Sequence, residues 1–117
     1  MLRRCFIGAL LVALGVVLAP AAWAESLTKV EAKRVCMVND TVFPRDQIPV
    51  EVSGRTYFGC CEMCKGRLAE DVNVRQSVDP VSGKTVDKAT AVIGAAADGK
   101  VRYFESDRTF AEYIARP

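Results

Sequence analysis

Hydrophobic and polar positions alternate in four short segments of the chain, and this alternation predicts β-strands. The segments are residues 48–52, 55–58, 90–94 and 100–104. Ser53-Gly54 separates the first two segments and Asp98-Gly99 lies between the last two, and both dipeptides are typical of hairpin turns. The pattern therefore predicts two β-hairpins.

A helix is predicted after each hairpin. Residues 61–71 (CEMCKGRLAED) favour helix directly after the first hairpin. After the second hairpin, Ser106 is suited to cap a helix that carries Phe110, Tyr113 and Ile114 on one face. Each half of the chain is then a ββα unit.

The two halves resemble each other at a spacing of about 46 residues, which is the length of one supersecondary unit. The matching positions are Val35-Cys36 with Val81-Ser82, Tyr57-Phe58 with Tyr103-Phe104, and Leu68 with Ile114. Asp79-Pro80 marks the turn between the halves. We therefore predict an α+β fold of two ββα pseudo-repeats packed together, residues 35–73 and 74–117, preceded by a polar leader at 25–34.

The N-terminus has the pattern of a secretory signal peptide. Arg3 and Arg4 are followed by an apolar run over residues 5–18, and Ala22-Trp23-Ala24 provides an A-x-A cleavage site. The apolar run is shorter than the roughly 20 residues that a membrane-spanning helix needs. We expect residues 1–24 to be a cleaved signal peptide and the protein to be exported to the periplasm, without stable membrane insertion after cleavage.

Composition excludes several classes of function. The chain has no histidine, so histidine-based acid–base catalysis, histidine-activated nucleophiles and histidine-ligated metals are absent. No phosphate-binding loop or nucleophile motif is present, and we expect no enzymatic activity. Of the 16 basic residues, Arg3 and Arg4 lie in the signal peptide, which leaves 14 to balance the 14 acidic residues. A neutral chain of this kind is not expected to bind nucleic acid.

Four cysteines remain after the signal peptide: Cys36 stands alone, and Cys60, Cys61 and Cys64 follow the first hairpin. On a helix, Cys64 is a neighbour of both Cys60 and Cys61. A helix N-terminus favours thiolate over thiol, and thiolates bind copper(I), zinc and other heavy metals. Both a three-thiolate and a four-thiolate site are open, as is the choice between Cys60 and Cys61 as ligand. We predict a metal site among Cys36, Cys60, Cys61 and Cys64, with copper(I) or zinc as the ion.

Two other interpretations use the same cysteines. In an exported chain they can form disulfides, with Cys36 joined to one helix cysteine and Cys61 joined to Cys64, which would make the protein a disulfide-stabilised interaction domain. Alternatively, Cys61 and Cys64 form a C-x-x-C pair that could cycle between dithiol and disulfide as a thiol-disulfide redox protein.

The arrangement of Cys36, an aromatic strand and then C-x3-C (Cys60, Cys64) resembles the TRASH domain and the related YHS domain. This resemblance implies a small treble-clef-like module that binds heavy metals and acts in their trafficking, resistance or sensing. It also implies a metal-donor or metal-acceptor protein as partner. Cys36, Cys60 and Cys64 match the three cysteines of the family, and Cys61 is an addition.

The second half also resembles a YHS domain, from residues 79–83 to the aromatic strand and Ser106. Its cysteines are missing, because Ser82 stands in place of the opening cysteine, and Ser106 and Phe110 stand in place of the later pair. We therefore expect a degenerate second unit without a metal.

Overall fold

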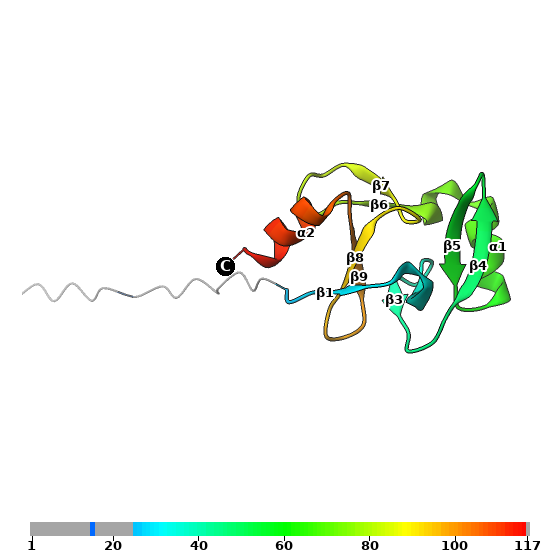
Figure 1. The fold of residues 1–117 in the computed structure, drawn as a ribbon, viewed down its shortest axis with the longest axis horizontal. Coiled ribbons are helices and arrows are strands. Elements are labelled where there is room, and N and C mark those ends of the chain that lie inside the picture. The colour runs from blue at the N-terminus through cyan, green and yellow to red at the C-terminus, as the bar shows by residue number, and fades with distance from the viewer. Residues whose placement is uncertain (1–14, 16–24, 117) are drawn as a thin grey trace, which may run out of the picture.

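The computed structural model describes Gly15 and residues 25–116, and the predicted signal peptide lies outside the described residues except for Gly15. The described chain has a mixed α+β fold of two α-helices and several small antiparallel sheets (Figure 1). In chain order the elements are β1 (Thr28–Val30), the 3-10 helix η1 (Ala32–Arg34), β2 (Val35–Cys36), β3 (Thr41–Val42), β4 (Ile48–Val52), β5 (Arg55–Gly59), α1 (Glu62–Glu70), the 3-10 helix η2 (Val72–Arg75), β6 (Gln76–Val78), β7 (Thr85–Asp87), β8 (Val92–Ala95), β9 (Val101–Phe104) and α2 (Asp107–Ile114).

The first predicted hairpin and its helix are confirmed. β4 and β5 pair antiparallel from Ile48 opposite Gly59 to Val52 opposite Arg55. Ser53 and Gly54 connect them with φ values of 51° and 79°. Positive φ at both central residues is the geometry of a type I′ turn, which matches the twist of the flanking strands. α1 then packs on this hairpin.

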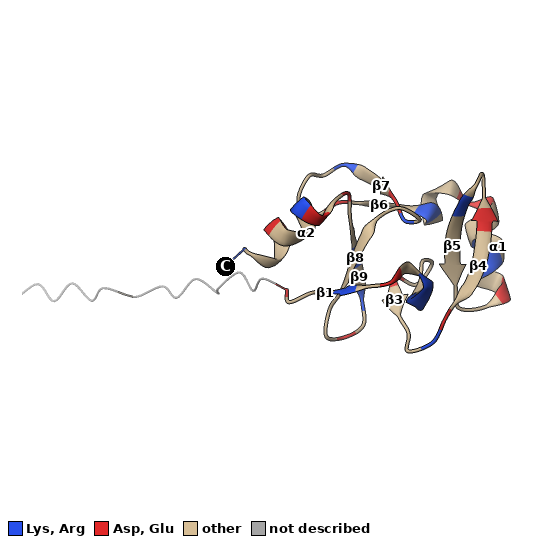
Figure 2. Cartoon of the chain, in the orientation of Figure 1, with Lys and Arg blue, Asp and Glu red and all other residues tan. Residues whose placement is uncertain are grey.

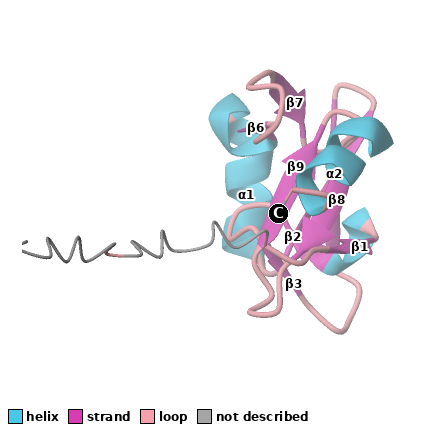
Figure 3. Cartoon of the chain, turned by 90° about the vertical axis from the view of Figure 1, so that its left-hand side faces the viewer, coloured by secondary structure: helices cyan, strands magenta, loops and turns pink. Residues whose placement is uncertain are grey.

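The second predicted hairpin is also present, but its sheet has a third strand that the sequence analysis did not predict. β8 and β9 pair antiparallel, and β1 pairs with the other edge of β8, with Lys29 opposite Gly94 (Figure 3). Residues 25–34, which we predicted to be a polar leader, thus contain a strand and a 3-10 helix. A three-residue strand with one apolar side chain has too little alternation to be recognised locally.

α2 covers the second sheet mainly through aromatic contacts. As predicted, Ser106 caps the helix, and its side chain accepts a hydrogen bond from the amide of Thr109. Phe110 and Tyr113 both pack edge-on against the buried Phe104, at ring-centroid distances of 5.3 and 5.4 Å. Ile114, predicted to share this face, is 44% exposed, whereas Leu68 in α1 is fully buried. Leu68 and Ile114, which we predicted to correspond, therefore differ in burial.

The two halves share one hydrophobic core, built from Val35, Met37, Val50, Tyr57, Leu68, Val86, Ile93, Ala95, Val101 and Tyr103. Backbone hydrogen bonds also join them, because the amide of Val42 donates to Gly99 and the amide of Val101 donates to Asp40. The loop between β2 and β3 is thereby fixed against the β8–β9 hairpin. Cys36, at the end of β2, is thus held by contacts from both halves.

Lysine and arginine residues are interspersed with aspartate and glutamate residues along the ribbon (Figure 2).

The helices within the described part of the chain are too short or too polar to cross a membrane.

Candidate metal centre

Three of the four predicted cysteines converge at one point. The sulfur atoms of Cys36, Cys60 and Cys64 all lie within 4.8 Å of one another, and we call these residues the inner triad. Cys36 comes from the end of β2, Cys60 from the connection between β5 and α1, and Cys64 from the first turn of α1. Their convergence depends on the packing of β2 and α1 against β5.

Gly59 allows the end of β5 to approach α1 closely enough for this convergence. A Cβ atom at Gly59 would lie 3.0 Å from the Cβ of Cys64 and 3.2 Å from the backbone nitrogen of Lys65. The positive-φ glycines of the described chain are Gly54, Gly83 and Gly99, so Gly59 is required for its small size and not for a left-handed backbone.

The sulfur separations match those of ligands around a common ion. The Cys60 and Cys64 sulfurs lie 3.6 Å apart, and those of Cys61 and Cys64 lie 3.4 Å apart. Thiolates placed tetrahedrally at about 2.3 Å from zinc are separated by about 3.8 Å. All four cysteines in the described part of the chain are free, and a disulfide would require a sulfur separation of about 2.05 Å.

Cys61 lies next to the inner triad but is not part of it. Its sulfur touches that of Cys64 but lies outside the group whose members are all within 4.8 Å of one another. Cys61 is exposed and occupies the N-cap position of α1, with extended backbone angles. Cys36 and Cys64 are buried, and Cys60 is half-buried.

The thiols differ in their affinity for protons. Burial raises the pKa of Cys36, but hydrogen bonds from nearby backbone amides outweigh burial and bring this pKa below its ordinary value. The first turn of α1 lowers the pKa of Cys61, above all through the amide and thiol of Cys64.

The two remaining thiols keep their protons more firmly. The hydrogen bond with Cys36, together with burial, raises the pKa of Cys60. Burial and the hydrogen bonds with Cys61 and Cys60 raise the pKa of Cys64 to about 12. Ligands must be deprotonated to bind a metal, so an ion entering this site displaces protons, including the one on Cys64.

The loop after Cys36 contributes the amides that stabilise its thiolate, namely those of Asn39 and Val38. Asn39 also donates from its side chain to the sulfur of Cys60, at 3.5 Å. One loop thus supplies both a cysteine and the hydrogen bonds that polarise the cluster.

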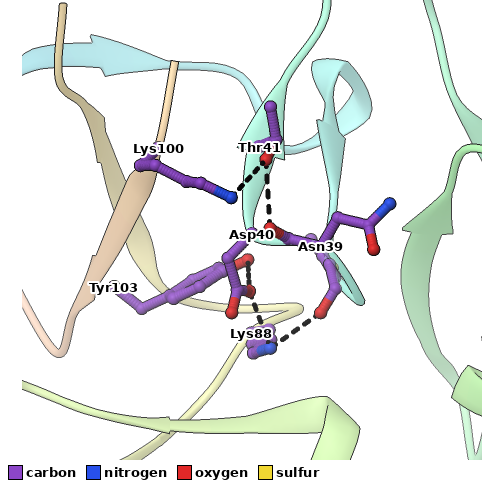
Figure 4. Close-up of polar contacts among 7 residues, drawn as sticks. Asn39, Asp40, Thr41, Lys88, Lys100 and Tyr103 are labelled. Carbon is purple, nitrogen blue, oxygen red and sulfur yellow. Dashed lines mark hydrogen bonds and ion pairs between the residues drawn. The ribbon is translucent and has the colours of Figure 1, made fainter. Parts of the chain in front are cut away.

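A buried lysine from the second half supports this loop (Figure 4). Lys88 is 4% exposed, and its ammonium donates to the carbonyl of Met37 at 2.7 Å and to the carboxylate of Asp40 at 2.9 Å. The hydroxyl of the buried Tyr103 donates to the same carboxylate oxygen at 2.8 Å. We did not predict these contacts, because Lys88 is separated from the loop by about 50 residues and carries no local signal of burial.

In the second half, Asp79 is buried three residues before Ser82, the residue that we aligned with Cys36. Asp79 is fully buried, and its carboxylate accepts hydrogen bonds from the amides of Val81, Ser82 and Glu105 at 2.7, 3.1 and 2.8 Å. Ser82 is exposed.

The chemistry available at the inner triad is the binding of a soft or borderline ion by three thiolates. Comparison of the chain with protein-family models, curated proteins and solved structures found no match. The thiol geometry therefore carries the functional conclusion.

Proposed function

We propose that this protein is an exported metal-binding protein that holds one copper(I) or zinc ion through Cys36, Cys60 and Cys64. The observation that carries the proposal is the approach of these three sulfurs to within 4.8 Å of one another from three separate elements. Three thiols brought together without a disulfide form a ligand set that needs only deprotonation to bind a soft ion.

The ligand count favours a site that exchanges its ion. A structural zinc site is closed by four protein ligands, whereas a site with three ligands leaves a coordination position for a water or an incoming group. The protein would then act in metal trafficking, resistance or sensing, with a metal donor or acceptor as its partner. This role agrees with the resemblance of Cys36, Cys60 and Cys64 to the TRASH and YHS domains, and it requires no enzymatic activity.

We also propose that the fold consists of two treble-clef-like ββα pseudo-repeats. Support comes from hydrogen bonds, because Asp79 receives three backbone amides much as the Cys36 thiolate receives those of Asn39, Val38 and Cys60. Both helices begin after an extended N-cap residue, Cys61 or Ser106. The pairs that correspond in this comparison are Cys36 with Asp79, Cys60 with Glu105, Cys61 with Ser106, and Cys64 with Thr109.

A second candidate function is thiol-disulfide exchange by Cys61 and Cys64. The observation that favours it is the 3.4 Å contact between their sulfurs at the first turn of α1. Unlike metal binding, this function requires neither Cys36 nor Cys60.

Metal titration of the protein purified from the periplasm tests the proposal. After anaerobic reduction and removal of metals, we expect it to bind about one equivalent of copper(I) or zinc, because one thiolate cluster supports one ion. Cys64→Ser should abolish binding, and the control Ser82→Ala, which alters an exposed residue away from the triad, should leave it intact.

Thiol counting on the native protein separates the alternatives. Free thiols at all four cysteines, with metal present, support the metal site. Full oxidation of the four cysteines in the periplasm would contradict it and favour the disulfide-stabilised domain. Oxidation restricted to Cys61 and Cys64 would favour the redox function.

A further inference from the structure

We infer that Cys61 is an exchange ligand: together with Cys64 it forms an outer site, through which the ion of the inner triad passes to an acceptor with thiol ligands. This inference rests on the proposed metal binding and assigns a separate role to Cys61, the one cysteine of the described residues that lies outside the inner triad.

The exposure of the four cysteines increases from the interior of the protein to its surface. Cys36 is fully buried and Cys64 is 7% exposed, whereas Cys60 is half-buried and Cys61 is exposed. An ion held by the inner triad is therefore shielded on the side of Cys36. An acceptor can approach from the side on which the exposed Cys61 and the half-buried Cys60 lie.

Cys64 connects the two sites. Its sulfur lies 3.6 Å from that of Cys60 and 3.4 Å from that of Cys61, so both distances suit two ligands of one ion. An ion can consequently move outward while it remains bound to Cys64. It has to exchange only its bonds to Cys36 and Cys60.

The backbone keeps Cys61 out of the inner triad. Cys61 is the N-cap of α1, with φ −154° and ψ 172°, so its backbone is extended and it precedes the first residue of the helix, Glu62. Its sulfur reaches Cys64 but does not join the group formed with Cys36 and Cys60. In addition, Met63 of the same turn is 77% exposed and presents a thioether, a second soft donor, at the surface.

The exchange step conserves charge and electrons. The Cys61 thiol gives its proton to water and its sulfur forms a bond to the ion, while the bonds from the ion to Cys36 and then to Cys60 break and each electron pair stays on its sulfur. The Cys36 and Cys60 thiolates are released in this step and take up protons from water, one of which balances the proton that Cys61 gave up. A thiolate of the acceptor next binds the exposed ion and displaces Cys61 and Cys64, and neither the metal nor any sulfur changes oxidation state.

Cys61→Ser is a sharp test, because serine is a preferred N-cap residue and should preserve α1. The copper(I)-loaded protein is mixed under anaerobic conditions with excess dithiothreitol, and the loss of thiolate-to-copper charge-transfer absorption is followed by stopped flow. We expect the equilibrium affinity of Cys61→Ser to stay within about twofold of the wild type and its transfer rate to fall by about tenfold or more, which corresponds to a higher barrier for exchange.

Two variants serve as controls. Cys60→Ser removes a ligand of the inner triad and should weaken the equilibrium affinity for copper(I). Met63→Leu keeps the approximate size of the exposed side chain but removes its sulfur, so it shows how much of the transfer rate depends on the thioether.

Three results would overturn the inference. An unchanged transfer rate in Cys61→Ser would remove the exchange role and leave the proposed function intact. A loss of affinity as large as that in Cys60→Ser would make Cys61 a resident ligand. Failure of the wild-type protein to bind copper(I) or zinc would overturn the proposed function together with the inference.

Discussion

At the scale of single residues, the geometry of the candidate metal centre depends on side chains that carry no sulfur. Lys88 places its ammonium on the carbonyl of Met37, one residue after Cys36, and shares Asp40 with Tyr103. A buried ammonium is tolerated only where hydrogen bonds and charge compensate its loss of hydration. This network therefore fixes the loop that holds Cys36, and the cysteine is placed before any metal arrives.

Gly59 allows β5 and α1 to approach each other closely, and the effect of this approach on stability can be measured. In Gly59→Ala the new Cβ would lie 3.0 Å from the Cβ of Cys64 and 3.2 Å from the nitrogen of Lys65, so α1 must shift away from β5. We expect a loss of stability of about 1–3 kcal/mol in urea unfolding, the usual cost of overpacking. Because Cys64 moves with α1, the metal affinity should fall too.

Gly66→Ala is the matched control for this change. Gly66 lies within α1, where an added Cβ meets nothing within 4 Å. Alanine there should stabilise the helix by about 0.5–1 kcal/mol. Equal effects of the two substitutions would show that the close approach at Gly59 is unimportant.

At the scale of the elements, α1 and α2 are fixed by different chemistry at their N-termini. α1 begins beside a cluster of thiols, whereas α2 begins beside the carboxylate of Asp79, which receives the amide of Glu105. A carboxylate can satisfy several backbone amides without a metal, because it has two oxygens and a full charge. The second half thus fixes the start of its helix without cysteines.

Asp79 should make part of the stability dependent on pH. Its burial raises the pKa, but hydrogen bonds from Glu105, Thr109 and the turn amides outweigh burial and lower the pKa below its ordinary value. The resulting stabilisation is complete above the unfolded pKa of about 3.9 and is lost as the pH falls through the lower native pKa.

Asp79→Asn tests this directly. The amide group of asparagine can accept at only one atom, so one buried backbone amide loses its partner, and we expect a loss of about 1–3 kcal/mol at neutral pH. Urea unfolding between pH 2 and 7 should also show a shallower acid dependence. The control variant Asp98→Asn alters an exposed carboxylate and should show neither effect. An acid dependence in Asp79→Asn equal to that of the wild type would contradict the assignment of this dependence to Asp79.

At the scale of the whole molecule, the sequence was informative where contacts are local. The two hairpins, both helices, the Ser106 cap and the clustering of Cys60 with Cys64 follow from neighbouring residues and were predictable. β1, the buried position of Lys88 and the role of Asp79 depend on partners between about 25 and 65 residues away, for which local patterns give no signal. The position of Cys61 outside the inner triad required the backbone angles of the N-cap.

These long-range contacts predict that the described chain unfolds as one unit. The hydrophobic core draws on both halves, and β1 ties the start of the described chain to β8. Leu27, just before β1, is 8% exposed, and its side chain lies against Gly94 of β8. Leu27→Ala should therefore cost about 2–4 kcal/mol, as truncation of a buried leucine does, and the loss should extend to the metal centre in the other half.

Two probes of one unfolding experiment check this. Far-ultraviolet circular dichroism follows both halves, and thiolate-to-metal absorption of the loaded protein follows the inner triad alone. For one cooperative unit, the two transitions coincide and Leu27→Ala shifts both equally, whereas the exposed control Thr28→Ala shifts neither. If the absorption kept its wild-type midpoint in Leu27→Ala, the two halves would be independent, and the contacts of Lys88, Asp40 and Val42 across them would contribute little to holding Cys36 in place.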